Sequence, residues 1–321
     1  MLKRFAMALA LLGTSTPPVV TQTTTRSMFV FQNNFWLNLH QFLRGEIYRS
    51  GAKLPLGIDP TSFSDADRAA WLSVMEVYTD VAKEDLLFDP NARLIANTLA
   101  MTGDAARLPE GLLDARTVGA LNAAAPIYRA KLWNSRQRDN ESWNASAKAL
   151  VDRHQTAMAA ALAKAYGITW PSEPYLVDAV GESGPNSGYT HDGPSGFAAH
   201  IQASTGSVRN TGDAPLELIF HEASHVPAVG GRITRMIEEE CARQKLPVPP
   251  DLWHFMISFS TGVITRRELA NTGSPGYMPY YERYNQMPPV VRSAFERDWL
   301  PYLEGKIPLE QSLHDLVRDA R

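Results

Sequence analysis

The sequence has little cysteine, with Cys241 alone among its 321 residues. One cysteine cannot form an intrachain disulfide, and it cannot supply a zinc site built from several thiolates. Any zinc site in this chain must therefore use histidine and carboxylate ligands. An excess of charge is also lacking, because 31 Lys and Arg residues balance 34 Asp and Glu residues to a net charge of -3. The chain thus carries neither the basic footprint of a nucleic-acid-binding protein nor an acidic tail.

Several other signals are missing. The sequence contains no Gly-rich phosphate loop and no nucleophile elbow, which argues against phosphate-loop and serine-hydrolase chemistry. Beyond the N-terminus, no apolar run approaches the length of a membrane-spanning helix. The composition, 44% hydrophobic and 20% charged, is that of an ordinary globular protein. Its length allows one large domain or two modest ones.

The N-terminus has the three-part pattern of an export signal. Lys3 and Arg4 form a positive region, residues 5–12 form an apolar run, and residues 13–18 break it. We therefore expect a signal peptide over residues 1–22, with only an approximate end because no Ala-x-Ala site follows. This predicts an exported protein, periplasmic or secreted. The alternatives are a buried N-terminal helix or an uncleaved anchor.

Helical periodicity dominates the chain up to residue 168. Phe31 and Phe35 would share the apolar face of a first helix with Leu39 and Phe42. Ser64 is placed to cap a second helix. Further helices are expected at 91–101, 115–132 and 139–166, the last ended by Gly167.

The pattern changes from residue 169 onward. Residues 175–180 and 199–204 have the composition of strands, a loop rich in Gly, Ser, Pro and Asn lies between them, and helices follow. We therefore predict a mostly helical α+β fold. It would consist of a helical region at 27–168 and an α+β region with a small sheet at 169–321.

One pentapeptide carries the chemistry. Residues 221–225, HEASH, place His221 and His225 one turn apart on one face of a helix, so both imidazoles can reach one metal ion. Zinc lowers the pKa of a coordinated water toward ~7, and Glu222 is placed to accept a proton from it as a general base. The alternative is a pair of core histidines. That alternative is costly, because two histidines and a glutamate would be buried without a metal.

This segment resembles the active-site helix of the zincin metallopeptidases. The resemblance covers roughly residues 175–300 and leaves out the helical first half. In zincins a strand of the sheet before the active-site helix binds extended peptide by β-addition. The strand at 199–204 has a similar place in the sequence, so the resemblance implies that His200, Gln202 and Ser204 bind substrate.

A catalytic zinc needs a third protein ligand and an open position. The metzincin branch takes that ligand from a histidine shortly after the second one, and residues 226–231 contain none. The gluzincin branch takes a Glu from the following helix. Glu240 falls on the apolar face of the helix expected at 232–245, so it is the carboxylate candidate. The alternative is that Glu240 is a solvated charge in an acidic run.

His254 is the rival third ligand. It lies in a helix that begins after Asp251 and is apolar nearly all round except for one polar stripe, which also contains Ser258, Thr261 and Thr265. The polar side chains of such a buried stripe need polar partners, and a cavity that holds a metal ion would provide them. Hydrogen bonding to carbonyls in the core is the alternative. We favour His254 over Glu240, which departs from the gluzincin pattern.

An oxyanion stabiliser is the remaining expectation. Zincins place a Tyr or His near the zinc to stabilise charge on the substrate carbonyl. The loop at 273–281 carries three tyrosines, and the resemblance implies Tyr280 in this role, with Tyr277 behind it. Packing of an aromatic loop onto the core is the alternative.

These residues predict an exported Zn²⁺-dependent hydrolase, a metallopeptidase acting on a peptide or on another small amide or ester. Neither a nucleic-acid partner nor a membrane span beyond the N-terminal signal is expected. The alternative is an exported helical binding protein whose metal is structural or absent. A structural site is closed by four protein ligands, which His221, His225, His254 and Glu240 could supply. In such a closed structural site, Glu222 would have no chemical role.

Overall fold

A computed structural model describes residues 27–50, 59–83, 89–182 and 187–321. The signal peptide predicted over residues 1–22 lies outside the described residues. Within the described ranges, none of the helices has both the length and the apolar character needed to cross a membrane. The fold is mostly helical α+β with one small mixed sheet, as the sequence predicts.

The sheet has four strands in the order β1-β2-β4-β3. The first three in that order are parallel, and β3 runs antiparallel to β4 at the edge. The prediction of β2 and β4 is confirmed, whereas β1 and β3 were not expected. Phe31 lies in β1 and not on the first helix. The strands are β1 (Phe29–Gln32), β2 (Tyr175–Val180), β3 (Gly188–Asp192) and β4 (Ala199–Ser204).

The N-terminal helices form a core of their own. Trp36, Trp71 and Tyr78 are fully buried in it, and Leu176 and Val180 of β2 join it from the sheet. Ser64 caps α2 as predicted, in a capping box with Asp67. The elements are α1 (Phe35–Ser50), a 3-10 turn (Pro60–Ser62), α2 (Asp65–Val81), α3 (Pro90–Ala100) and α4 (Ala115–Tyr128).

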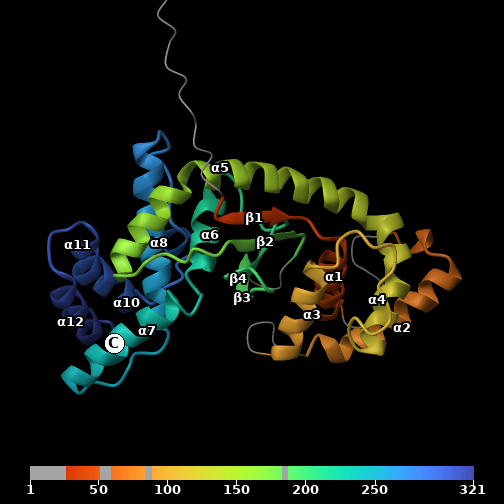
Figure 1. Ribbon diagram of the computed structural model, residues 1–321, viewed down its shortest axis with the longest axis horizontal. Coiled ribbons are helices and arrows are strands. Elements are labelled where there is room, and N and C mark those ends of the chain that lie inside the picture. The colour runs from red at the N-terminus through yellow and green to blue at the C-terminus, as the bar shows by residue number, and fades with distance from the viewer. Residues whose placement is uncertain (1–26, 51–58, 84–88, 183–186) are drawn as a thin grey trace, which may run out of the picture.

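The long helix α5 (Asn134–Tyr166) follows α4 through a π-helical turn (Arg129–Trp133) and crosses the top of the molecule (Figure 1). As the sequence predicts, the helix ends at Gly167. The φ of Gly167 is 62°, the left-handed conformation that glycine commonly adopts at the end of a helix. The last part of α5 packs into the C-terminal core through Val151, Met158 and Leu162, and β1 contributes Phe29 to the same core. The boundary predicted between residues 168 and 169 therefore does not separate the two cores. Helix α5 precedes this boundary, but its apolar face packs into the second core.

The C-terminal helices surround the second core. Its elements are α6 (Ala214–Ala223), α7 (Gly230–Gln244), α8 (Leu252–Asn271), α9 (Tyr280–Arg283), α10 (Pro289–Ala294), a π-helical turn (Phe295–Trp299), α11 (Leu300–Leu303) and α12 (Leu309–Asp319). Helix α8 is buried along most of its length, as its apolar sequence predicts.

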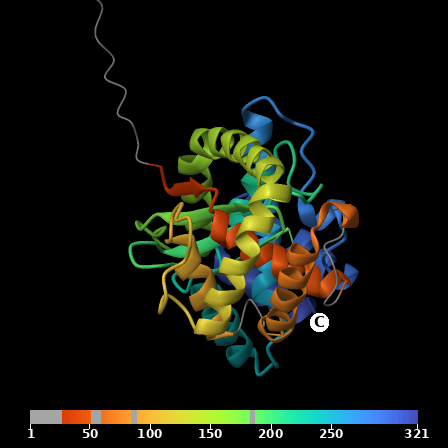
Figure 2. The ribbon, with the colours of Figure 1, turned by 90° about the vertical axis from the view of Figure 1, so that its right-hand side faces the viewer.

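The sheet separates two groups of helices. On one face, Thr190 of β3 contacts Glu222 of α6. On the other face, Tyr189 and His200 contact Gln41 of α1 and Asn97 of α3. Figure 2 views the molecule from the side of the N-terminal helices. The motif helix α6 thus lies against the sheet face opposite to the N-terminal helices, next to the edge strand β3.

Candidate metal centre

Helix α6 carries the first part of the HEASH motif into the core. Pro215 occupies its first turn, and the helix is buried from Ala214 to Phe220. Asp213 stands at the N-cap position, but its side chain makes no capping hydrogen bond. The helix ends at Ala223, where the Ser224 hydroxyl donates to the Phe220 carbonyl at 2.8 Å. His221 therefore sits in the last turn of α6, and His225 lies just beyond Ser224, so the two histidines do not share one helix face as the sequence predicts.

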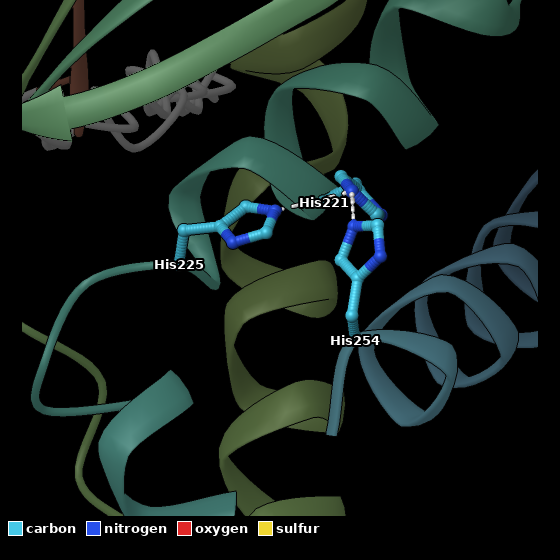
Figure 3. A group of neighbouring side chains, drawn as sticks. All are labelled: His221, His225 and His254. Atoms are coloured by element: carbon cyan, nitrogen blue, oxygen red, sulfur yellow. Dashed lines mark hydrogen bonds between the residues drawn. The ribbon is translucent and has the colours of Figure 1, made fainter. Parts of the chain in front are cut away.

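Three histidine side chains meet at one point. His221 Nε2 lies 3.2 Å from His225 Nε2 and 3.2 Å from His254 Nε2. Each of the three histidines offers one ring nitrogen within 4.8 Å of the others. His254 reaches the site from the first turn of α8, as Figure 3 shows. The structure thus brings together the two motif histidines and the favoured third ligand.

These spacings fit a shared metal ion better than hydrogen bonds. In a tetrahedral site with Zn–N bonds of about 2.05 Å, two ligand nitrogens are separated by about 3.3 Å. A neutral imidazole nitrogen carries either one proton or one lone pair, so His221 Nε2 cannot form two full hydrogen bonds with its two neighbours. A cation between the three nitrogens would satisfy all of them at once.

The electrostatics of the cluster favour neutral imidazoles. Burial lowers the pKa of His221 well below its usual value, and the neighbouring His225 and His254 add to the effect. Burial also lowers the pKa of His225 to about 3 and lowers that of His254. The neutral ring is the form with a lone pair for a metal, so the three side chains are in the state that binds zinc.

Glu222 is buried beside the cluster and is tied to the sheet. The Thr190 hydroxyl donates a 2.8 Å hydrogen bond to Glu222 Oε2. Burial raises the pKa of Glu222 to about 7. Its other oxygen, Oε1, lies beside Gly188, where a Cβ would be 3.4 Å away. The sequence analysis did not identify Thr190 or Gly188 as site residues. Both lie in β3, so they could have been identified only if β3 had been predicted as a strand next to α6.

A cavity of about 690 Å³ lies in front of the cluster. The three histidines and Glu222 line it together with the edge strand β3 and the start of α8. Its polar and charged lining outside the cluster includes Arg93, Thr190, His191, Asp192, Arg209, Asp251, Ser258 and Gln286. The cavity is large enough to hold a section of peptide beside the histidines.

The structure does not bring Glu240 to the histidines. Glu240 is buried, as its place on the apolar face of α7 implies. Its carboxylate accepts hydrogen bonds from Arg243 Nε at 2.9 Å and Gln244 Nε2 at 2.7 Å, and it lies 3.0 Å from His314 Nδ1 on α12. The face of α7 that holds Glu240 is therefore turned toward α12 and away from α6.

The Tyr280 hydroxyl forms its hydrogen bonds with the loop before α6. It donates to Asn210 Oδ1 at 2.9 Å and lies 3.0 Å from the Arg209 carbonyl. The Tyr280 backbone N–H and the Tyr277 hydroxyl both donate to the carboxylate of Glu217. The expected oxyanion stabiliser is thus a residue that joins the 273–281 loop to α6 and to the loop before it.

The predicted substrate-binding residues of β4 are buried inside the sheet. His200 contacts Asp178 at 2.7 Å, Gln202 accepts a hydrogen bond from Gln41 at 2.8 Å, and Ser204 donates to the Gly181 carbonyl. Strand β4 lies between β2 and β3, so its backbone cannot pair with a further strand. The open edge beside the cavity belongs to β3, which the sequence did not reveal as a strand.

No protein-family model, curated protein or solved structure matches this chain. Because fold alone does not define function, the activity must be inferred from the geometry and chemistry of the site. The histidine cluster, the buried Glu222 and the open edge of β3 are the features that carry this inference.

Proposed function

We propose that the protein is a zinc-dependent hydrolase that cleaves peptides, as the zincin metallopeptidases do, and that it acts outside the cytoplasm. The observation that supports this most strongly is the convergence of the Nε2 atoms of His221, His225 and His254 next to a buried glutamate. The export signal expected over residues 1–22 supports the location.

The three histidines would hold the zinc ion and leave one coordination position open. Among the residues that the structure describes, no fourth His, Cys, Asp or Glu joins the cluster. Structural zinc sites are closed by four protein ligands, whereas catalytic sites have three. When bound there, zinc would polarise a substrate carbonyl and acidify a water molecule. The count of ligands therefore favours the hydrolase over the binding protein with a structural metal.

Glu222 would act as the general base. The hydrogen bond from Thr190 holds its Oε2 in place, and Oε1 lies on the Gly188 side of the cavity. A carboxylate in this position can take a proton from water and return it to a leaving amine. Thr190 is thus a positioning residue for Glu222.

The edge strand β3 would bind the substrate. The Ser204 N–H donates to the Ser187 carbonyl at 2.9 Å, which sets the pairing of β3 with β4. In an antiparallel ladder the inward-bonded residues alternate, so Tyr189 and His191 bond to β4, and Gly188 and Thr190 turn their backbone groups outward. An extended peptide can add to those outward groups by β-addition. The proposal therefore assigns substrate binding to β3 in place of β4, which lies between two strands.

The direct test is Glu222→Gln, which keeps the size of the side chain and removes the base. Zinc-loaded wild-type protein should cleave members of an internally quenched peptide library. The variant should bind the same amount of zinc but cleave at least ~100-fold more slowly, the usual contribution of a general base. Glu239→Gln, at an exposed glutamate of α7, is the matched control and should retain full activity. Failure of the zinc-loaded wild type to cleave any library peptide would refute the proposal.

A further inference from the structure

Two arginines border the cavity, and they differ in whether a carboxylate pairs with them. Arg93 pairs with Asp192 of β3 at 3.4 Å. Arg209 lines the cavity as well, yet it forms an ion pair with no carboxylate in the part of the chain that the structure describes. Arg209 therefore brings to the border of the cavity a positive charge that no carboxylate of the described residues pairs.

Arg209 is held firmly although it is exposed. Its guanidinium carbon lies 4.4 Å from the centre of the Tyr284 ring. Its carbonyl lies 3.0 Å from the Tyr280 hydroxyl. The next residue, Asn210, is fully buried and donates from Nδ2 to the Ser187 carbonyl at 2.7 Å and to the Ser204 carbonyl at 2.8 Å. The contact with the Tyr284 ring holds the guanidinium in place, and among the described residues its N–H groups donate no hydrogen bond.

The anchoring of this loop also places Arg209 along the path of a substrate. Asn210 bonds to Ser187, which directly precedes the first residue of β3. That first residue, Gly188, is the one that lies beside Glu222 Oε1. A peptide added to β3 would thus pass the Arg209 loop at the end of the strand nearest the general base.

We propose that Arg209 forms a subsite for a carboxylate of the peptide substrate, and that the protein prefers peptides with such a group next to the cleaved bond. A guanidinium matches a carboxylate through two parallel N–H···O bonds, which gives both attraction and orientation. The carboxylate can come from the chain terminus or from an Asp or Glu side chain. This inference rests on the proposed peptidase function.

The test uses zinc-loaded protein and four quenched peptide pools. The pools combine a free or amidated C-terminus with the presence or absence of acidic residues near the centre, and kcat/KM is measured for each. The wild type should prefer a carboxylate-bearing pool, and the preferred pool identifies whether the carboxylate is terminal or in a side chain. Arg209→Gln should reduce that preference by about tenfold, as expected for one charge-assisted interaction. Arg209→Lys, which keeps the charge without the planar fork, should give an intermediate preference.

Arg93→Gln is the matched control, because it removes one positive charge from the same cavity. It should leave the carboxylate preference within about twofold of the wild type, since Arg93 is already paired. Equal cleavage of all four pools by the wild type, or an unchanged preference in Arg209→Gln, would overturn the subsite and leave the peptidase proposal standing. No cleavage of any pool by the zinc-loaded wild type would overturn the peptidase function and the subsite with it.

Discussion

The Thr190 hydroxyl donates a 2.8 Å hydrogen bond to Glu222 Oε2 and thereby joins the edge strand of the sheet to the helix of the HEASH motif. One contact links the strand proposed to bind substrate with the carboxylate proposed to accept the proton. A change at Thr190 should therefore affect the chemical step without touching the metal ligands.

Thr190→Val removes this hydrogen bond while keeping the shape of the side chain. We expect kcat to fall by roughly 10- to 100-fold, because a hydrogen bond to a charged buried group is worth about 1.5–3 kcal/mol. Zinc content should not change. Thr190→Ser restores the hydroxyl and should recover most of the rate. A Val variant with wild-type kcat would show that Thr190 does not position Glu222.

Tyr280→Phe tests whether this tyrosine stabilises the oxyanion, as the sequence predicts, or only joins its loop to the loop before α6. The change removes a hydroxyl that bonds to Asn210 and lies near the Arg209 carbonyl, so we expect the free energy of unfolding to fall by about 1–3 kcal/mol. Cleavage of an uncharged, amidated peptide should fall far less than the ~100-fold loss that follows removal of an oxyanion donor. Urea unfolding and kcat on the same preparation distinguish the two roles. A 100-fold loss of kcat with unchanged stability would restore the oxyanion assignment.

Glu217 should make the stability of the protein depend on pH. Burial raises the pKa of its carboxyl group to about 7 in the folded protein, although Tyr277 and Tyr280 donate hydrogen bonds to it. A raised carboxyl pKa means that the folded state holds the proton more tightly. Its contribution to stability is therefore complete below pH ~4.5 and is lost as the pH rises through about 7.

Glu217→Gln should remove this dependence. Relative to the wild type, the variant should gain roughly 3 kcal/mol in free energy of unfolding between pH 4.5 and pH 8. Urea midpoints measured at both pH values give this difference directly, and any constant effect of the substitution cancels. A wild-type protein whose stability relative to the variant stays constant or increases with pH would contradict the assignment.

Much of the fold follows from local patterns in the sequence. Helices such as α2 and α5 were predictable because their apolar residues recur with helical spacing and residues such as Ser64 and Gly167 mark their ends. Strand β3 was not, because its buried face carries the polar His191, which contacts Gln202 of β4, so its sequence lacks the alternation of a typical half-buried strand. Strand β1 was hidden because Phe31 continues the spacing of the helix that follows.

The site was predictable in part for the same reason. The HEASH spacing and the polar stripe that includes His254 are local features of the sequence, and the structure brings their histidines together although α6 ends before His225. The roles of Glu240 and Tyr280 were harder to predict, because they depend on which neighbouring element each buried residue packs against. Helical periodicity indicates that the Glu240 face is buried but not that it faces His314 of α12. Tertiary contacts of this kind carry no signal in a single sequence.

The identity of the third ligand can be tested by a pair of substitutions. His254→Ala should lose stoichiometric zinc at micromolar concentration, because two histidines alone make an incomplete site. Glu240→Gln should keep it, since Glu240 is bonded to Arg243 and Gln244 and lies near His314. Competition with a chelating dye gives both affinities. Loss of zinc in Glu240→Gln with retention in His254→Ala would reverse the assignment.

The most direct measurement is the zinc content of the purified mature protein by plasma mass spectrometry, compared with that of the double variant His221→Ala and His225→Ala. The account predicts about one zinc ion per wild-type chain and almost none in the double variant, with both proteins folded by circular dichroism. A folded wild-type protein that contains no zinc and takes up none at micromolar concentration would contradict the metal centre and the hydrolase proposed on it.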